Sequence, residues 1–351
     1  MSIRRTVVLH APNVHTGGGF VLLQALTAAW PGDVKLIALL DARARGHVML
    51  PDGAQVRWVD ASAGSRLKAE VYLSSTAVAS DVILCFHGLP PLFSSQAKVI
   101  VFLQNRLYLA RKLPSGYGLK SLVRLTFERF VSRIFRHRVT EYIVQTPSMQ
   151  RAVLQWYGAR DPVQPALRML PFVEALQASP GHNVRPPDWD FVYVADGEAH
   201  KNHRTMFAAW RLLAQDGLHP SLALTLSPRD RVLKRELDAL VVESGLRIKD
   251  LGQMPHEKVL SLYATARAMI FPSTSESFGL PLIEATHAGL PILASELDYV
   301  RDVCSPVQTF DPTSAISIAR AVKRFLAVPE PVLQIRSPHD FLRELLGTAP
   351  E

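Results

Sequence analysis

Cysteine is scarce in this chain of 351 residues, which contains only Cys85 and Cys304. Two cysteines are too few for a disulfide framework or for a cysteine-based metal site. Cys85 lies inside the apolar run Val82–Phe86, where a thiol packs as a small hydrophobic side chain. We therefore expect both cysteines to be structural.

Long apolar segments are lacking as well. The basic start of the chain, Met1–Ala11, has only a short apolar stretch, and no later run approaches the roughly 18 apolar residues that would suggest a membrane span. No set of histidines or cysteines has the spacing of metal ligands. We expect a protein that stays in the cytoplasm and has no metal site and no cofactor.

The chain has fewer acidic than basic residues, 31 against 39, and a net charge of +8. This surplus favours anionic partners such as nucleotide phosphates, anionic lipid or nucleic acid, and does not choose among them. Clustered basic tails and nucleic-acid recognition motifs are missing, so no nucleic-acid partner is expected. The hydrophobic fraction of 48% excludes a disordered chain.

Short apolar strands alternate with helical patterns along the whole chain, which predicts parallel sheets with crossover helices. A stretch rich in proline and glycine, residues 179–189, interrupts the pattern and is typical of a linker. It divides the chain into a first domain, residues 1–178, and a second domain, residues 190–351, whose last helix we expect to pack back on the first domain. The predicted strands are Thr6–His10, Val34–Leu40, Val56–Val59, Val82–Phe86, Val99–Leu103, Tyr142–Gln145, Phe191–Ala195, Ala223–Leu226, Ile248–Leu251, Ala268–Phe271 and Pro291–Ala294.

The most specific motif follows the predicted strand Ala268–Phe271. A polar loop leads into a helix whose first turn contains Pro281, where a missing amide proton has no cost, and Gly289 can end the helix. Free amides at the start of such a helix form an anion site. Glu276 on the loop and Glu284 one turn into the helix flank this site; the alternative is that Glu276 is solvated and Glu284 only favours the helix dipole.

The run from Pro272 to Ala285 resembles the Glu-x7-Glu signature of retaining glycosyltransferases of family 4 (group 1), of the bacterial surface-polysaccharide type. The resemblance implies an α/β chain with the GT-B fold, two doubly wound Rossmann-like domains that face each other across a cleft. It also implies that Glu284 binds the donor ribose and that Glu276 contacts the donor sugar. The backbone around the next four residues would hold the sugar and the diphosphate: Ser277, Phe278, Gly279 and Leu280.

Other segments are similar to the donor side of this family. Lys201 would face the donor diphosphate and neutralise charge on the leaving phosphate, unless it is a solvated loop lysine. Many relatives place an arginine five residues earlier, where this chain has Asp196, and Arg229 is a substitute. Backbone groups near Gln253 and Met254 would contact the nucleobase, or form an ordinary turn.

The glycine triplet Gly17–Gly19 follows the first strand and precedes a predicted helix, so Gly18 and Gly19 would let a phosphate or a sugar approach the backbone. His87, after the strand Val82–Phe86, is a candidate for the acceptor side and for the proton acceptor, or a structural histidine. Gln104 stands where relatives often have a second histidine. A glutamine can hydrogen-bond a hydroxyl but cannot shuttle a proton.

Residues 119–138 contain six basic residues and the single acid Glu128. At helical spacing Val123, Phe127, Phe130, Val131 and Ile134 share one face, and Arg129, Arg133 and Arg136 lie opposite. One interpretation is a helix packed on its own sheet with a solvated basic face. The other is a surface that docks on anionic lipid or on a lipid-diphosphate acceptor.

Taken together, these residues and the resemblance to family 4 imply a retaining, metal-independent glycosyltransferase. It would move a sugar from a nucleotide-diphosphate donor to a saccharide or lipid-linked acceptor, and the first candidate for the donor is GDP-mannose. The reaction would belong to lipopolysaccharide or exopolysaccharide assembly at the inner face of the plasma membrane. A nucleotide-sugar hydrolase or epimerase of the same fold and a non-catalytic module that binds anionic surfaces are the alternatives. A nicotinamide-dependent dehydrogenase fits less well, because Gly17–Gly19 lacks the Gly-x-Gly-x-x-Gly spacing.

Overall fold

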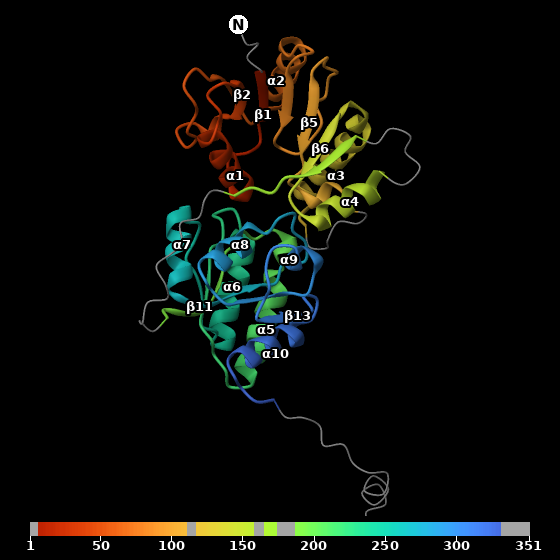
Figure 1. Cartoon of the computed structure of the whole chain (residues 1–351). Coiled ribbons are helices and arrows are strands. Elements are labelled where there is room, and N and C mark those ends of the chain that lie inside the picture. Colours follow the sequence, from red (N-terminus) through yellow and green to blue (C-terminus); the bar gives the residue numbers. More distant parts are fainter. Residues whose placement is uncertain (1–5, 111–116, 158–164, 174–186, 331–351) are drawn as a thin grey trace, which may run out of the picture.

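The computed structural model describes residues 6–110, 117–157, 165–173 and 187–330. They form two domains, each built on one fully parallel sheet with helices around it, and Figure 1 shows the first domain above the second. Within these residues, no helix is both long enough and apolar enough to cross a bilayer. The predicted organisation into two doubly wound α/β domains is confirmed.

The first domain contains a sheet in the order β3-β2-β1-β4-β5-β6-β7. Its strands are β1 (Thr6–Ala11), β2 (Lys35–Asp41), β3 (Gln55–Val59), β4 (Val82–Cys85), β5 (Lys98–Phe102), β6 (Glu141–Val144) and β7 (Ala166–Met169). Its helices are α1 (Gly17–Ala28), α2 (Ala63–Thr76), α3 (Leu119–Ile134) and α4 (Pro147–Tyr157), with the short 3-10 helices η1 (Ala42–Ala44), η2 (Arg106–Tyr108) and η3 (Phe135–Arg138).

The second domain contains a sheet in the order β10-β9-β8-β11-β12-β13. Its strands are β8 (Trp189–Tyr193), β9 (Leu222–Leu224), β10 (Ile248–Asp250), β11 (Ala266–Phe271), β12 (Ile292–Ser295) and β13 (Gln308–Phe310). Its helices are α5 (His203–Gln215), α6 (Arg231–Ser244), α7 (His256–Ala264), α8 (Leu280–His287), α9 (Asp298–Arg301) and α10 (Ala315–Phe325), with the 3-10 helix η4 (Ala199–Lys201).

Every predicted strand is present within one or two residues of its predicted ends, but β7 and β13 were not predicted. Both are edge strands. Three of the four residues of β7 are exposed, and β13 buries only Phe310. An edge strand with little buried surface needs no apolar run, so hydrophobic periodicity does not detect it.

The predicted linker, residues 179–189, lies mostly outside the described residues, and the part that is described ends in β8, which begins at Trp189. The predicted packing of the last helix on the first domain concerns residues beyond 330 and also lies outside them. The first sheet ends with β7 and the second begins with β8, on either side of this segment.

Each sheet reverses its strand order once, between β1 and β4 in the first domain and between β8 and β11 in the second. Loops that leave the carboxyl ends of neighbouring strands diverge at such a switch point, and ligands of doubly wound folds bind there. The candidate residues lie on these loops. Gly18 follows β1, His87 follows β4, Lys201 follows β8 and Glu276 follows β11.

Candidate active site

The two switch-point loops of the second domain meet through a buried ion pair. Lys201 Nζ donates to Glu276 Oε1 at 2.7 Å, and each side chain is less than one-fifth exposed. Burial alone would lower the pKa of Lys201, but Glu276, assisted by Asp196, raises it above its ordinary value. Burial would raise the pKa of Glu276, but Lys201 and His200 bring it below its ordinary value. Both groups are therefore charged at neutral pH, as the proposed roles require.

The backbone around Lys201 is held tightly. Tyr193, which ends β8, donates its hydroxyl to the Lys201 carbonyl at 2.7 Å. Asn202 adopts a left-handed conformation, with φ of 62°, and its amide donates to the carbonyls of Pro272 and Pro312. Asparagine tolerates this conformation better than most residues. These contacts fix where the ammonium group of Lys201 points.

Beyond Glu276 the loop ends in helix α8, which begins and stops as the sequence predicts. Gly279 precedes α8 with φ of +70°, Pro281 lies in the first turn, and Gly289, with φ of +68°, follows the end. The positive φ requires glycine at position 279. The N-terminus of α8 faces the first domain, where a Cβ on Gly18 would contact the Leu280 side chain at 3.8 Å.

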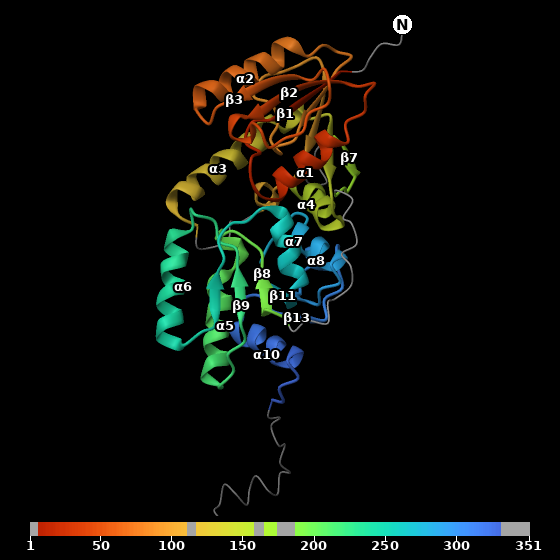
Figure 2. The ribbon, with the colours of Figure 1, turned by 90° about the vertical axis from the view of Figure 1, so that its left-hand side faces the viewer.

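A second contact ties the same loop to the first domain. The Thr146 hydroxyl, between β6 and α4, donates to the Ser277 carbonyl at 3.0 Å. Phe278 is buried, and Ser277 and Leu280 are half-buried. The loop and the start of α8 therefore form part of the interface between the domains (Figure 2).

Glu284, in the second turn of α8, is buried and has two partners. Its Oε1 lies 2.9 Å from His256 Nε2, and its Oε2 accepts from the Tyr263 hydroxyl at 3.2 Å. Both partners belong to α7, which follows the loop with Gln253 and Met254. Gln253 is exposed and Met254 is half-buried. The segments that the resemblance assigns to the ribose and to the base are thus in direct contact.

Arg229 lies in the loop between β9 and α6 and is exposed. Burial lowers the pKa of His15 in the first domain, and the charges of Arg43 and Arg229 lower it further. Arg229 therefore lies near the opposite domain. The next residue, Asp230, holds the loop after β8, because its carboxylate accepts a hydrogen bond from the Gly197 amide at 2.8 Å.

The glycine triplet does not lie between a strand and a helix, as the sequence suggested. It forms the first turn of α1 instead, which starts at Gly17. Two of its positions require glycine, one because of the backbone conformation and one because of the space available. Gly17 has φ of +70°, and a Cβ on Gly19 would lie 3.0 Å from Gln104 Oε1. Gln104 in turn donates to the Phe86 carbonyl at 2.7 Å.

His87 lies in the turn after β4 and packs edge-to-face on His10, with ring centroids 4.6 Å apart. Its Nδ1 lies 3.0 Å from the His10 carbonyl, so Nδ1 carries the proton and Nε2 is the acceptor. Burial lowers the pKa of His87 to about 4. A neutral imidazole at pH 7 can accept a hydrogen bond from a hydroxyl, but it is a weak base.

The two histidines beside Lys201 differ. His200 Nδ1 lies 2.8 Å from the hydroxyl of Tyr117, a residue of the first domain, and burial lowers its pKa to about 4. His203 is buried between Tyr193 and Phe207, and burial lowers its pKa to about 3. His203 is therefore a packing residue, whereas His200 joins the domains.

Four residues around this site carry no assigned role in the sequence reading: His256, Tyr263, Tyr117 and Thr146. Only His256 and Tyr263 had a signal, because they follow the predicted base-contacting residue Met254 by two and nine positions. Tyr117 and Thr146 act across the domain interface, and sequence spacing contains no information about that. Among the described residues, no group of three or more His, Cys, Asp or Glu side chains is arranged to hold a metal ion.

Comparison with known proteins shows what the second domain is similar to. Residues 177–337 match the profile of the family described as "Glycosyl transferases group 1". O-antigen chain mannosyltransferase B of Escherichia coli is 34% identical over 119 residues, which cover 32% of this chain and 30% of that protein. The serotype-specific mannosyltransferase WbdA of Escherichia coli is 35% identical over 147 residues, 40% of this chain and 17% of that protein. The chain thus matches about a third or less of the length of these curated relatives.

Solved structures match over almost the whole chain. Sucrose-phosphate synthase from Thermosynechococcus elongatus superimposes with a TM-score of 0.64 at 19% identity, covering 92% of this chain and 90% of that one. HepE of Anabaena, solved in complex with UDP-glucose, gives 0.64 at 15% identity, covering 92% and 89%. At such identities the likeness shows the fold, which is GT-B. The second domain of this chain is therefore similar to group 1 glycosyltransferases, and the chain as a whole has the two-domain fold of GT-B glycosyltransferases.

Proposed function

We propose that this protein is a retaining, metal-independent hexosyltransferase. It transfers a sugar from a nucleotide-diphosphate donor, with GDP-mannose as the first candidate, to a saccharide or lipid-linked acceptor. The reaction belongs to lipopolysaccharide or exopolysaccharide assembly. The observation that carries the proposal is the charged Lys201–Glu276 pair at the switch point of the domain that matches the group 1 model, on the loop that leads into the N-terminus of α8. The names of the Escherichia coli relatives support mannose and the O-antigen pathway.

In this proposal each residue acts on a different part of the donor. The Glu284 carboxylate accepts hydrogen bonds from the ribose hydroxyls, and the backbone near Gln253 and Met254 contacts the base. The α8 N-terminus and the Lys201 ammonium group stabilise the diphosphate, with Arg229 as a further cation from the cleft side. Glu276 both orients Lys201 and accepts from a donor sugar hydroxyl.

Retention follows if the acceptor hydroxyl enters on the face from which the diphosphate departs. The departing phosphate oxygen then receives the hydroxyl proton, and His87 Nε2 accepts a hydrogen bond from the same hydroxyl. The chain needs positioning and charge stabilisation more than a strong base for this step. A His87 of pKa about 4 fits that role, because it stays neutral through the physiological range.

The test is transfer from a panel of α-linked nucleotide sugars, with GDP-mannose and UDP-glucose included, followed by proton NMR of the fresh product. We expect turnover with one donor, an α-linked product and full activity in the presence of a chelator. A β-linked product would refute retention. Equal turnover without any acceptor would favour the hydrolase or epimerase alternative, and absence of nucleotide-sugar binding would favour the non-catalytic module.

The Glu284→Gln variant should bind the donor nucleotide about ten- to a hundredfold more weakly, with little change in kcat at saturation. The charge-assisted hydrogen bonds to ribose contribute roughly 1.5–3 kcal/mol, and ribose changes little on the way to the transition state. Glutamine keeps the shape of the side chain and an acceptor for the Tyr263 hydroxyl. Calorimetric titration with the nucleoside diphosphate measures the effect.

The exposed Glu257 of α7 provides a matched control, because Glu257→Gln removes the same charge from the same domain without touching Glu284. Equal nucleotide affinities of the Glu284→Gln and Glu257→Gln proteins would exclude the ribose role.

Membrane attachment is a second part of the proposal and rests on helix α3. Of the five side chains on the predicted apolar face of α3, only Val131 is buried, so this face as a whole does not pack on the sheet. Along one stripe of the helix five apolar side chains are between 43% and 77% exposed: Leu119, Val123, Phe127, Phe130 and Ile134. Only Leu125, Val131 and Ser132 are buried. An exposed apolar stripe of this length marks an interaction site.

The charges around the stripe favour an anionic lipid surface. Lys120, Arg124 and Arg133 are exposed next to it. The other arginines of the predicted basic face make contacts within the protein. Arg129 donates to the Ala110 carbonyl, and Arg136 lies over the rings of Trp156 and Tyr157. Apolar side chains flanked by cations are typical of helices that lie in the interface of an anionic bilayer.

The Phe127→Ser/Phe130→Ser double variant should bind vesicles that contain anionic lipid at least tenfold more weakly than the unmodified protein. Burying one such side chain contributes roughly 1.5–3 kcal/mol. Replacing Arg133 by serine should instead remove part of the salt dependence, because each cation near the surface contributes about 1 kcal/mol. Vesicle sedimentation at low and high salt measures both effects.

Val242 in α6 is 86% exposed and lies in the second domain, so Val242→Ser is the matched control for loss of an exposed apolar side chain. Binding that is as strong for the double variant as for Val242→Ser would show that α3 does not enter the bilayer.

A further inference from the structure

A cavity of about 470 Å³ opens between the two domains next to the loop that contains Glu276. The first domain lines it with Arg106, Leu107 and Ala110, and the second domain with Thr274 and Ser275. The loop between β12 and α9 completes the wall with Glu296, Leu297, Asp298 and Tyr299. Its volume lies within the range of small-molecule sites. None of these residues has a role in the donor contacts proposed above.

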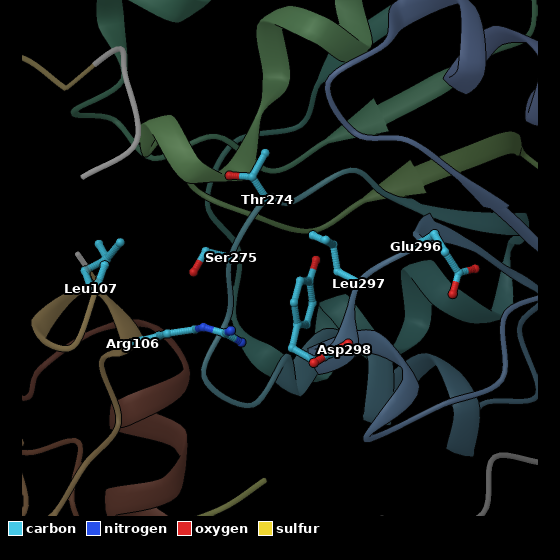
Figure 3. Close-up of a pocket in the computed structure, with 9 residues that line it drawn as sticks. Arg106, Leu107, Thr274, Ser275, Glu296, Leu297 and Asp298 are labelled. Atoms are coloured by element: carbon cyan, nitrogen blue, oxygen red, sulfur yellow. The ribbon is translucent and has the colours of Figure 1, made fainter. Parts of the chain in front are cut away.

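The cavity contains one cation whose charge is not balanced by a described residue. Figure 3 shows the Arg106 side chain extending from the first domain towards the loop with Ser275. Within residues 6–110, 117–157, 165–173 and 187–330, no side chain forms an ion pair with Arg106 and no group accepts a hydrogen bond from its guanidinium. Arg106 is half-buried, so water compensates its charge only in part.

The two carboxylates of the cavity already have arginine partners. Glu296 accepts from the Arg301 guanidinium, with Nε to Oε1 at 2.8 Å, and Asp298 Oδ2 lies 3.1 Å from an Arg151 nitrogen. They therefore do not balance Arg106. A planar guanidinium without a partner, in a cavity, matches the geometry of a phosphate or a carboxylate.

The remaining wall suits a saccharide. Thr274 and Ser275 supply hydroxyls, Asp298 supplies a carboxylate oxygen, and Leu107 and Leu297 supply apolar contact for a sugar ring. Ser275 is the chain neighbour of Glu276, so the cavity and the Lys201–Glu276 pair share one loop. The first-domain wall is η2, against which the exposed helix α3 packs. The cavity is thus next to the proposed lipid-facing surface.

We propose that this cavity is an acceptor subsite and that it binds a sugar bearing an anionic group, a phosphate or a carboxylate, which Arg106 recognises with paired hydrogen bonds. The proposal rests on the proposed transferase function and adds the charge class of its acceptor. An uncharged sugar leaves the Arg106 guanidinium unpaired and binds more weakly. Because Arg106 belongs to the first domain, this selection is independent of the ribose contacts of Glu284.

The test is calorimetric or NMR titration of the full chain, saturated with the nucleoside diphosphate, with three probes: mannose 1-phosphate, glucuronate and uncharged mannose. We expect the better anionic probe to bind about ten- to a hundredfold more tightly than mannose, since hydrogen bonds to charged groups contribute roughly 1.5–3 kcal/mol. Whichever of phosphate and carboxylate binds better identifies the source of the charge. Arg106→Gln should abolish the preference and Arg106→Lys should restore part of it.

Arg320→Gln removes the same charge from α10, at a residue whose side chain is 62% exposed, and should keep the preference. Nucleotide affinity, measured in every variant, separates the two proposals. If the unmodified protein and all variants fail to bind a nucleotide, the proposed transferase function is refuted. If nucleotide binds normally and the three probes bind equally, the anionic acceptor subsite is refuted. A loss of nucleotide affinity in Arg106→Gln would likewise refute it, because Arg106 would then belong to the donor site.

Discussion

Replacing Lys201 by methionine is expected to lower kcat by on the order of 100-fold or more, with a much smaller change in donor affinity. In the proposed function the Lys201 ammonium group stabilises the negative charge that grows on the leaving phosphate, and loss of one such electrostatic contact typically costs on the order of 100-fold or more in rate. Methionine keeps an unbranched side chain of similar length. Steady-state kinetics with a saturating donor, together with calorimetric affinity, measure the two effects separately.

The variant also leaves the buried Glu276 carboxylate without its cation, which destabilises the protein. The Lys201→Met/Glu276→Gln double variant removes that unpaired charge. The double variant is expected to recover its thermal stability, whereas its kcat should stay low because both side chains are proposed to contact the donor. Recovery of both would show that Lys201 is only a structural partner of Glu276. Lys258→Met, at an exposed position of α7, is the control for removal of a lysine from the same domain.

Acidification from pH 8 to pH 5 is expected to cost the protein several kcal/mol of folding stability through its buried histidines. Burial lowers the pKa of His87 and of His200 to about 4 and that of His203 to about 3, from an ordinary value of 6.5. Between pH 8 and pH 5 the unfolded chain binds more protons at these histidines than the folded chain does, so the free energy of unfolding falls as the pH falls. Each of these histidines contributes roughly 2 kcal/mol of that loss by pH 5.

Glu70 acts in the opposite direction. Burial raises its pKa to about 6 from 4.5, so the folded state takes up this proton first and gains about 1 kcal/mol by pH 5. The three histidines together cost the folded state more than Glu70 returns. Since domains of this kind are typically stable by only about 5–15 kcal/mol, the loss is a large fraction of the total.

His203→Phe isolates one histidine. Its ring lies between Tyr193 and Phe207, and neither ring nitrogen has a hydrogen-bond partner in the described structure, so phenylalanine fits with little change in polarity. Urea unfolding at pH 8 and pH 5 should show that the variant loses about 2 kcal/mol less than the unmodified protein. The values at pH 8 supply the packing baseline. Parallel pH dependences for the two proteins would mean that His203 is not the proton-linked group.

The amino-acid sequence alone determines the elements whose signal is local. The strand–loop–helix from Ala266 to His287 was predicted almost residue by residue, because an apolar strand, a polar loop, Pro281 and Gly289 lie within one stretch of chain. The same holds for the central strands of both sheets. Their residues are buried on both faces and form continuous apolar runs, whereas the edge strands β7 and β13 do not.

The tertiary structure alone decides which distant groups meet and which surfaces stay uncovered. Lys201 and Glu276 are 75 positions apart, and His256 and Glu284 are 28 apart, so neither contact leaves a pattern in the sequence. Arg106 faces Ser275 only because the two domains close on each other. Helical periodicity predicts that Phe127 and Phe130 share a face with Val123. Whether that face is buried depends on the presence of a neighbouring element, and in this fold none of the described residues covers it.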